Sequence, residues 1–189
     1  MKNIAIFASG GGSNAQKIME HFENCSFAQV SLIISNKSKA GVLEKALIRN
    51  LPTLVLNREE FYKTENILKK LNTYNIDFVV LAGFLWLVPT YLVKAYKGRI
   101  VNIHPALLPK YGGKGMYGMN VHRAVHAAKE EETGPTIHFV NEHYDEGGII
   151  FQAKCSIQPT DSPENIAKKV LALEHKYYPQ VIEKVILKI

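Results

Sequence analysis

The sequence is poor in cysteine and has no long hydrophobic run. Its 189 residues include two cysteines, Cys25 and Cys155, which match no zinc motif and are too few for a disulfide framework, so we expect a reducing, cytoplasmic setting. No apolar stretch approaches the roughly 18 residues that indicate a membrane-spanning helix. The apolar run after Lys2 reaches glycines within a few residues, too early for a secretory signal peptide. Membrane association is therefore not expected.

Several motifs that define catalytic classes are missing as well. The glycine-rich segment 8–14, ASGGGSN, lacks the Lys-Ser/Thr of a P-loop and does not complete the G-x-G-x-x-G pattern of dinucleotide-binding proteins. The Gly-x-Ser-x-Gly elbow of a serine hydrolase does not occur. His122 and His126 have the spacing of a zinc pair, but Arg123 stands where a metallopeptidase carries glutamate, and no third ligand follows. We therefore expect no metal.

The charge balance is basic, with a formal net charge of +6. The lysines are scattered along the chain rather than clustered on one element, and no aromatic residues are interleaved with them, which argues against a nucleic-acid groove. We interpret the charge as a solubilising surface with some attraction for small anionic substrates.

Apolar runs and helix-like segments alternate along the first part of the chain. The runs that have the continuous apolar character of buried strands are 3–8, 30–35, 53–56, 78–83 and 100–104. The segments predicted as helices between them are 15–22, 42–48 and 59–72. This alternation is typical of a parallel sheet that helices cover on both faces.

The last part of the chain has a different pattern. Residues 135–140 alternate in polarity and 148–157 follow the tight turn YDEGG, so both are predicted as antiparallel or edge strands added to the sheet. A long final helix is predicted from Ser162, an N-cap followed by proline at the first helical position. The sequence thus predicts a single α/β domain over 1–189. Its fold class is an open, mostly parallel, twisted sheet (Rossmann-like) flanked by helices, with an antiparallel C-terminal extension.

The glycine-rich segment 8–14 joins the first predicted strand to the first predicted helix. Glycines let a backbone approach a ligand closely, and the first turn of a helix offers free N–H groups to an anion. A tight turn without a ligand explains the same residues equally well. Ligands of open α/β sheets bind at the carboxyl ends of strands, which favours a phosphate site.

The strand at 100–104, IVNIH, carries two polar side chains. Asn102 and His104 share one face because side chains alternate along a strand. An amide and an imidazole together on a buried-looking strand indicate a binding or catalytic site. His138 is interpreted as a partly buried structural histidine, and Asp145, taken alone, as a structural carboxylate in a turn.

A series of short segments then occurs in a recognisable order: ASGGGSN, ISNK, VVLAGF, NIHPALLPKY, HFVNEHYDEGGIIFQA and LEHKYYP. In this order they resemble the phosphoribosylglycinamide formyltransferase (glycinamide ribonucleotide transformylase) family of folate-dependent formyltransferases, over essentially the whole chain. The resemblance implies an enzyme of purine biosynthesis that moves the formyl group of 10-formyltetrahydrofolate to the amine of glycinamide ribonucleotide by direct attack. Its partners would be these small molecules, and the protein a monomer or homodimer.

The resemblance also implies roles for individual residues. The catalytic group would consist of Asn102, His104 and Asp145. The residues that would hold the ribonucleotide, through its phosphate and its ribose or glycinamide part, are Gly12, Ser13, Asn14 and Glu174. The residues that would hold the folate, from its reacting end to its tail, are Asn102, Leu85, Trp86, Leu87, Val88 and Arg58.

Two places depart from the family pattern. Trp86 stands where many relatives have arginine. Residues 111–119, YGGKGMYGM, begin a segment that is longer and richer in glycine than its family counterpart, and His122 after it still aligns with the family's histidine. We predict that residues 111–119 form a mobile flap that becomes ordered when substrate binds.

Three other functions are compatible with part of the pattern. A formyltetrahydrofolate hydrolase shares the catalytic group but carries an N-terminal regulatory domain and would leave the phosphate loop without a ligand. A methionyl-tRNA formyltransferase has a further C-terminal domain for tRNA, whereas this sequence ends at Ile189, straight after the last helix. A non-catalytic nucleotide-binding module would not need Asn102 and His104 on one strand face. We therefore expect the transferase.

Overall fold

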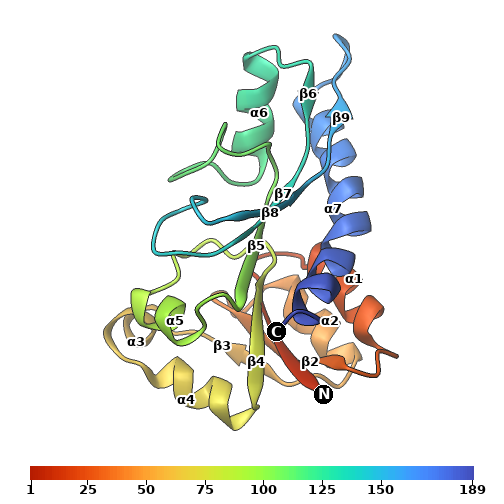
Figure 1. Ribbon diagram of the computed structural model, residues 1–189. Coiled ribbons are helices and arrows are strands. Elements are labelled where there is room, and N and C mark those ends of the chain that lie inside the picture. The colour runs from red at the N-terminus through yellow and green to blue at the C-terminus, as the bar shows by residue number, and fades with distance from the viewer.

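The computed structural model describes residues 1–189 and is built on a seven-stranded sheet (Figure 1). The strand order is β3-β2-β1-β4-β5-β7-β8. The parallel strands are β1 (Lys2–Phe7), β2 (Ala28–Ser35), β3 (Thr53–Val55), β4 (Ile76–Leu81) and β5 (Ile100–His104). The strands β7 (Thr136–Phe139) and β8 (Ile149–Gln152) are added antiparallel. The predicted fold class is confirmed.

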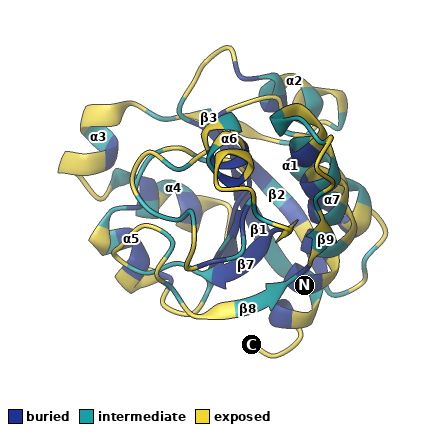
Figure 2. Ribbon diagram, turned by 90° about the horizontal axis from the view of Figure 1, so that it is seen from above, coloured by how far each residue is buried: buried dark blue, intermediate teal, exposed yellow.

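Helices cover both faces of the sheet (Figure 2). The helices on one face are α1 (Ser13–Phe22), α2 (Gly41–Ile48) and α7 (Pro163–Ile186). Those on the other face are α3 (Arg58–Lys63), α4 (Asn66–Thr73) and α5 (Thr90–Ala95). The remaining helix, α6 (Met119–Ala127), packs against α7 beyond the strand ends (Figure 1). None of these helices combines the length and apolarity that a membrane crossing requires.

The two-sided burial explains the continuous apolar runs in the sequence. In β1, Ile4 and Ile6 belong to the core with α1 and α7, while Ala5 and Phe7 belong to the core on the opposite face. Because successive side chains of a strand point to opposite faces, both sets must be apolar.

The helix predicted over 59–72 is wrong in one respect, because the chain forms two helices there. Thr64 has extended backbone angles and separates α3 from α4. Its hydroxyl donates to the carbonyl of Glu60 at 2.8 Å and accepts from the N–H of Asn66 at 3.3 Å. One threonine thus terminates the first helix and supports the start of the second, which apolar periodicity alone does not reveal.

The single extension strand predicted over 148–157 also divides into two. β8 joins the main sheet, whereas β9 (Cys155–Ser156) pairs with β6 (Glu132–Thr133) in a separate two-stranded sheet. The backbone after β6 comes very close to the backbone before β9, since a Cβ on Gly134 would lie 1.8 Å from the carbonyl oxygen of Ala153. Strands as short as β6 and β9 show no alternation of polar and apolar residues, so the sequence pattern could not predict them.

The final helix, α7, has the predicted start and links the site to the core. Ser162 accepts a hydrogen bond from the N–H of Asn165, and Pro163 occupies the first turn. Further along, the fully buried Tyr178 donates its hydroxyl to the carbonyl of Leu81 at 2.9 Å and also lies 3.3 Å from that of Val101. This contact docks α7 on the last residue of β4 and on the early part of β5, and Glu174, one turn earlier in α7, lines the cavity.

Candidate active site

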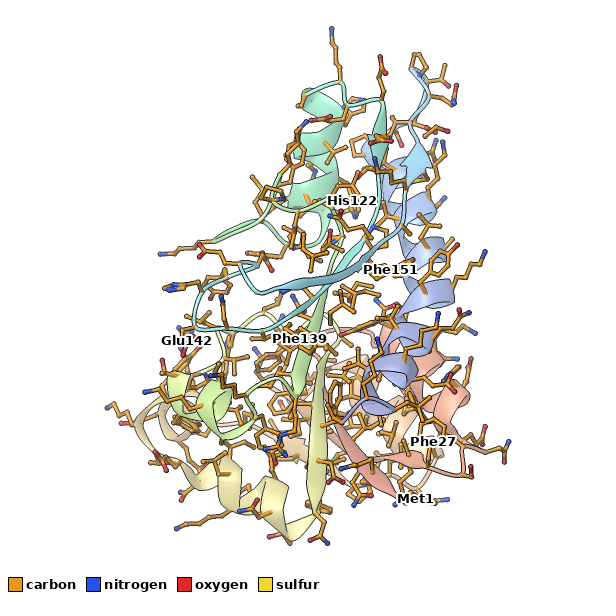
Figure 3. All side chains as sticks on the ribbon, viewed as in Figure 1. Met1, Phe27, His122, Phe139, Glu142 and Phe151 are labelled. Carbon is orange, nitrogen blue, oxygen red and sulfur yellow. The ribbon has the colours of Figure 1, made fainter.

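A cavity of about 660 Å³ lies at the carboxyl ends of β4 and β5, next to the point where the strand order reverses. This is where open α/β sheets bind ligands. Figure 3 labels His122 of α6 above the carboxyl end of β5, and Phe139 of β7 further down, where β7 pairs with Val101 near the start of β5. The predicted site residues that line the cavity are Asn14, Leu85, Trp86, Leu87, Val88, Asn102, His104, Asp145 and Glu174. Those outside its lining are Gly12, Ser13 and Arg58.

Four polar side chains meet at the centre of the cavity. β5 supplies Asn102 and His104 on one face, as the alternation predicts, and the antiparallel register places His138 of β7 directly opposite Asn102. Asp145, from the loop after β7, lies between them. Its Oδ2 is 3.4 Å from Nδ1 of His104, and its Oδ1 is 3.6 Å from Nε2 of His138 and 3.5 Å from Nδ2 of Asn102. The three residues predicted as the catalytic group are therefore brought together, with a second imidazole beside them.

The loop that carries Asp145 is tightly folded. Asp145 itself has a φ of 58°, an uncommon value for a residue other than glycine and one that aspartate tolerates better than most residues. Gly147 is obligatory, since a Cβ there would lie 1.7 Å from the carbonyl oxygen of Phe139. Burial opposes ionisation of Asp145, but the contact with His138, the nearby imidazole of His104 and an N–H donated by Gly113 at 3.0 Å hold its pKa below the usual range. Asp145 is therefore a carboxylate at neutral pH.

His104 is enclosed, with 3% of its surface exposed. Its Nε2 donates to the backbone carbonyl of Tyr111 at 2.7 Å. The neighbouring Asp145 carboxylate raises the pKa of His104, but it does not decide the net direction. Burial lowers the pKa of His104 by more than Asp145 and the Tyr111 carbonyl raise it. The imidazole is thus neutral at neutral pH in the ligand-free site.

His138, interpreted from the sequence as a partly buried structural histidine, is buried and lies within the polar cluster. Its Nδ1 lies 2.8 Å from the carbonyl of Phe139, so this nitrogen carries the hydrogen, and Nε2 lies 3.2 Å from Nδ2 of Asn102. His138 is 2% exposed and lines the cavity. Alternation in the sequence gives the face of His138, but only the antiparallel pairing with β5 reveals its partner.

The glycine-rich loop leaves the start of α1 open. Gly12 has a φ of 72°, and a Cβ there would lie 2.6 Å from the side chain of Val42 in α2, so packing alone requires glycine. No side chain caps the first N–H groups of α1. A Cβ on Gly10 or Gly11 would meet nothing within 4 Å, so open space lies beside these residues. The loop has the geometry of an anion site at a helix N-terminus.

Glu174 of α7 connects this loop to the cavity. Nδ2 of Asn14 donates to the Glu174 carboxyl at 2.6 Å, and no other partner of that carboxyl exists. Glu174 is 7% exposed, and burial raises its pKa to about 7 although the Asn14 hydrogen bond lowers it. The buried Oδ1 of Asn14 has no hydrogen-bond partner. Both residues line the cavity, so they present unsatisfied polar atoms to a ligand.

The histidines considered as a zinc pair do not share one environment. His122 is 6% exposed and lines the cavity, whereas His126 faces solvent. Burial lowers the pKa of His122, and its Nδ1 has no hydrogen-bond partner.

The fold and the site together define an α/β protein in which strand ends hold an amide, two imidazoles and a carboxylate in one cavity. Such a cluster suits transfer of a small group between ligands that lie side by side. The family model described as "Formyl transferase" matches residues 2–182. The chain belongs to the formyl transferase family.

Several similar members of this family are phosphoribosylglycinamide formyltransferases. The phosphoribosylglycinamide formyltransferase of Bacillus subtilis is 33% identical over 191 residues, which cover 98% of this chain and 95% of that protein. The chloroplastic phosphoribosylglycinamide formyltransferase of Arabidopsis thaliana is 44% identical over 190 residues, which cover 96% of this chain and 64% of the plant protein. This chain therefore spans less than two thirds of the plant relative's length. The crystal structure of the phosphoribosylglycinamide formyltransferase from Bacillus halodurans matches with a TM-score of 0.87 at 37% identity, covering 97% of this chain and 95% of that chain.

Proposed function

We propose that this protein is a phosphoribosylglycinamide formyltransferase. It transfers the formyl group of 10-formyltetrahydrofolate to the amine of glycinamide ribonucleotide in purine biosynthesis. The observation that carries the proposal is the position of the polar cluster. Asn102, His104 and Asp145 lie in a single cavity whose lining runs from Asn14 and Glu174 at the glycine-rich loop to the segment 85–88. The names of the relatives support the same substrates.

The ribonucleotide occupies the part of the cavity that Asn14 and Glu174 line, next to the glycine-rich loop. Its phosphate accepts hydrogen bonds from the free N–H groups of Ser13 and Asn14 at the start of α1, where the helix dipole favours an anion. Glu174 and Oδ1 of Asn14 accept hydrogen bonds from the hydroxyls next to the phosphate, since Oδ1 is a buried acceptor without a partner and the Glu174 carboxyl has Asn14 as its one partner. The amine of the substrate then points toward β5.

The formyl donor occupies the part of the cavity that the segment 85–88 lines. The backbone of 85–88 and the apolar side chains of Leu81, Val88 and Val140 form a wall suited to a flat pterin ring. The formyl-bearing nitrogen then lies at Asn102. Two ligands held in this way react as if in one molecule, which removes much of the entropic part of the barrier.

The cluster supplies the proton chemistry of direct attack. When the amine bonds to the formyl carbon, the formyl oxygen becomes negative and the amine nitrogen positive. Nδ2 of Asn102 has two hydrogens. One points to His138 at 3.2 Å, while the contact with Asp145 is 3.5 Å, at the limit of hydrogen-bond length, so the second hydrogen is available to the new oxyanion.

His104 moves the proton. Neutral in the ligand-free site, it gains proton affinity as negative charge develops beside it and takes the proton from the positive amine nitrogen. It returns this proton to the folate nitrogen as the carbon–nitrogen bond breaks, which yields the formamide and tetrahydrofolate. Asp145 stabilises the transient imidazolium from 3.4 Å. To reach substrate, Nε2 leaves the Tyr111 carbonyl and the ring hydrogen moves to Nδ1, which donates it to Asp145, so that Nε2 is free to take the proton of the amine. The flap predicted over 111–119 therefore opens or shifts during the cycle; this flap stays a prediction.

Formation of tetrahydrofolate tests the function directly. Purified protein is mixed with 10-formyltetrahydrofolate in the presence and absence of glycinamide ribonucleotide, and absorbance follows deformylation. We expect turnover that requires the ribonucleotide and a formylated ribonucleotide by mass spectrometry. Equal turnover without the ribonucleotide, with formate as product, would identify a hydrolase instead. Formylation of methionyl-tRNA in a parallel reaction would identify the tRNA enzyme.

The phosphate site predicts a selective effect at Gly11. Gly11→Val places a side chain in the open space beside the first N–H groups of α1, so we expect KM for the ribonucleotide to rise about tenfold or more, as for a lost hydrogen bond to a charged group. KM for the folate should stay within twofold, since that part of the cavity is untouched.

The controls separate ligand exclusion from damage to the fold. Gly148→Val is the matched control, because a Cβ there also meets nothing within 4 Å and Gly148 does not line the cavity. Gly12→Ala should lower the thermal unfolding temperature with or without ligand because of the clash with Val42. If Gly11→Val raised KM for the ribonucleotide and KM for the folate equally, the phosphate would not bind at the glycine-rich loop.

A further inference from the structure

Tyr111 is held by hydrogen bonds at both its backbone and its side chain. Its carbonyl accepts from Nε2 of His104 at 2.7 Å, and its hydroxyl donates to Oε1 of Glu130 at 2.8 Å. Its φ of 57° lies in the left-handed region, which is unfavourable for a residue with a side chain. Such an angle persists where the surrounding contacts hold the residue on several sides, as they do here.

Glu130 anchors Tyr111 from outside the cavity. Glu130 lies just beyond the end of α6, and the oxygen that accepts the Tyr111 hydroxyl also accepts a hydrogen bond from Nζ of Lys110 at 2.8 Å. The hydrogen bonds from Lys110 and Tyr111 hold the pKa of Glu130 below its usual range. Glu130 is therefore a carboxylate at neutral pH, and a charged acceptor makes a stronger hydrogen bond to the hydroxyl than a neutral one.

The segment that begins at Tyr111 contacts two members of the catalytic group. The Tyr111 carbonyl occupies Nε2 of His104, and the N–H of Gly113 donates to Oδ2 of Asp145 at 3.0 Å. Between these contacts, a Cβ on Gly112 would lie 3.3 Å from Cβ of Asp145. Because the segment packs this closely, a shift of the Tyr111 backbone must alter its contact with His104.

We infer that Glu130 is a positioning residue for formyl transfer: through the Tyr111 hydroxyl, it sets how much of the time the Tyr111 carbonyl occupies Nε2 of His104. The inference rests on the proposed function, in which Nε2 must leave this carbonyl before it takes the proton of the amine. Glu130 does not line the cavity, so it acts through Tyr111. Loss of their hydrogen bond should release Nε2 more often, because one of the contacts that hold Tyr111 is then gone.

NMR of ligand-free protein with isotope-labelled histidine measures the occupancy of Nε2 without any reaction. Exchange of the Nε2 hydrogen of His104 with water reports how often the carbonyl releases it, and the spectrum of His104→Ala assigns the signal. We expect this exchange to become about tenfold faster in Tyr111→Phe and in Glu130→Ala, as for a lost hydrogen bond to a charged group. Glu130→Gln should lie between the parent and Glu130→Ala, because its amide oxygen still accepts the hydroxyl.

The rate of the chemical step tests whether this occupancy matters in the reaction. Single-turnover formyl transfer with both substrates bound should be severalfold faster in Tyr111→Phe and in Glu130→Ala, since Nε2 leaves the carbonyl more easily. A variant whose site was merely damaged would transfer the formyl group more slowly. Tyr111→Phe keeps the aromatic ring, which packs against the apolar cluster between α6 and α7.

Glu132→Ala is the matched control, because it removes a nearby carboxylate that pairs with Lys154 and does not line the cavity. Thermal unfolding reports whether each variant is folded. Unchanged exchange in folded Tyr111→Phe and Glu130→Ala would overturn the inference, and so would faster exchange with an unchanged or slower transfer step. If the parent protein transfers no formyl group, the proposed function fails, while the exchange measurement still shows whether Glu130 controls the contact at His104.

Discussion

We expect His104→Ala, Asn102→Ala and Asp145→Asn each to lower kcat by roughly a hundredfold or more while the protein remains folded. The three side chains meet within hydrogen-bonding or ion-pair distance in the ligand-free site, so each change removes part of one reaction centre. Without His104 the proton of the attacking amine has no carrier, and without Asn102 the oxyanion loses a fixed donor. Steady-state kinetics with both substrates at saturation measure the effect.

Asp145→Asn is the most informative of these variants. Asparagine accepts the positive φ of position 145 as readily as aspartate does, and it keeps the shape of the side chain, so the loop is retained. What disappears is the charge that stabilises protonated His104 from 3.4 Å. A selective loss in kcat, with both KM values nearly unchanged, is therefore expected.

Controls for these variants come from outside the cluster. His126→Ala removes an exposed imidazole of α6, and Glu142→Gln removes an exposed charge close to Asp145 in sequence, so both should retain normal turnover. Near-normal kcat in folded His104→Ala would show that the imidazole is structural and that the proton moves by another route. Loss of activity in Glu142→Gln would show that the loop responds to any change in charge.

The fold could be predicted because its strands are buried on both faces and its connections are helical. Continuous apolar runs such as 78–83 and 100–104 have few alternatives to a parallel sheet. The predictions failed where a few polar atoms decide the backbone. The hydroxyl of Thr64 divides one predicted helix, and the crossing at Gly134 divides one predicted strand. Such contacts leave no periodic signal.

For the site as well, relationships within one strand could be predicted from the sequence, and contacts between distant segments could not. Asn102 and His104 could be singled out because their relationship lies within one strand. Asp145 entered through a family resemblance, since nothing local distinguishes it from a solvated turn carboxylate. The position of His138 beside Asn102 could not be predicted, because it depends on the antiparallel register with β5. The lowered pKa of His104 could not be predicted either, since burial is a property of the assembled site.

Glu174 should make the free energy of unfolding depend on pH. Burial raises its pKa to about 7 in the folded protein, against 4.5 for an exposed glutamate. A carboxyl whose pKa is raised by folding favours the folded state at low pH, where it is protonated, and this advantage is lost as the pH rises through the folded value. Between pH 4.5 and 7 the loss amounts to roughly 3 kcal/mol.

Glu174→Gln should remove this dependence, because the amide keeps an oxygen for Nδ2 of Asn14 and cannot ionise. We expect the ligand-free variant to gain on the order of 3 kcal/mol over the parent protein at pH 8 and to match it near pH 4.5. Urea unfolding across this range measures the difference, with Glu142→Gln as an exposed control that leaves it unchanged. The sign is decisive: if Glu174→Gln is less stable than the parent at pH 8, the ionised carboxylate is stabilised in the folded protein and its pKa cannot be raised. Glu174→Gln should also raise KM for the ribonucleotide. The substrate's hydroxyls hydrogen-bond more strongly to an ionised carboxylate than to a neutral amide, and the amide cannot ionise.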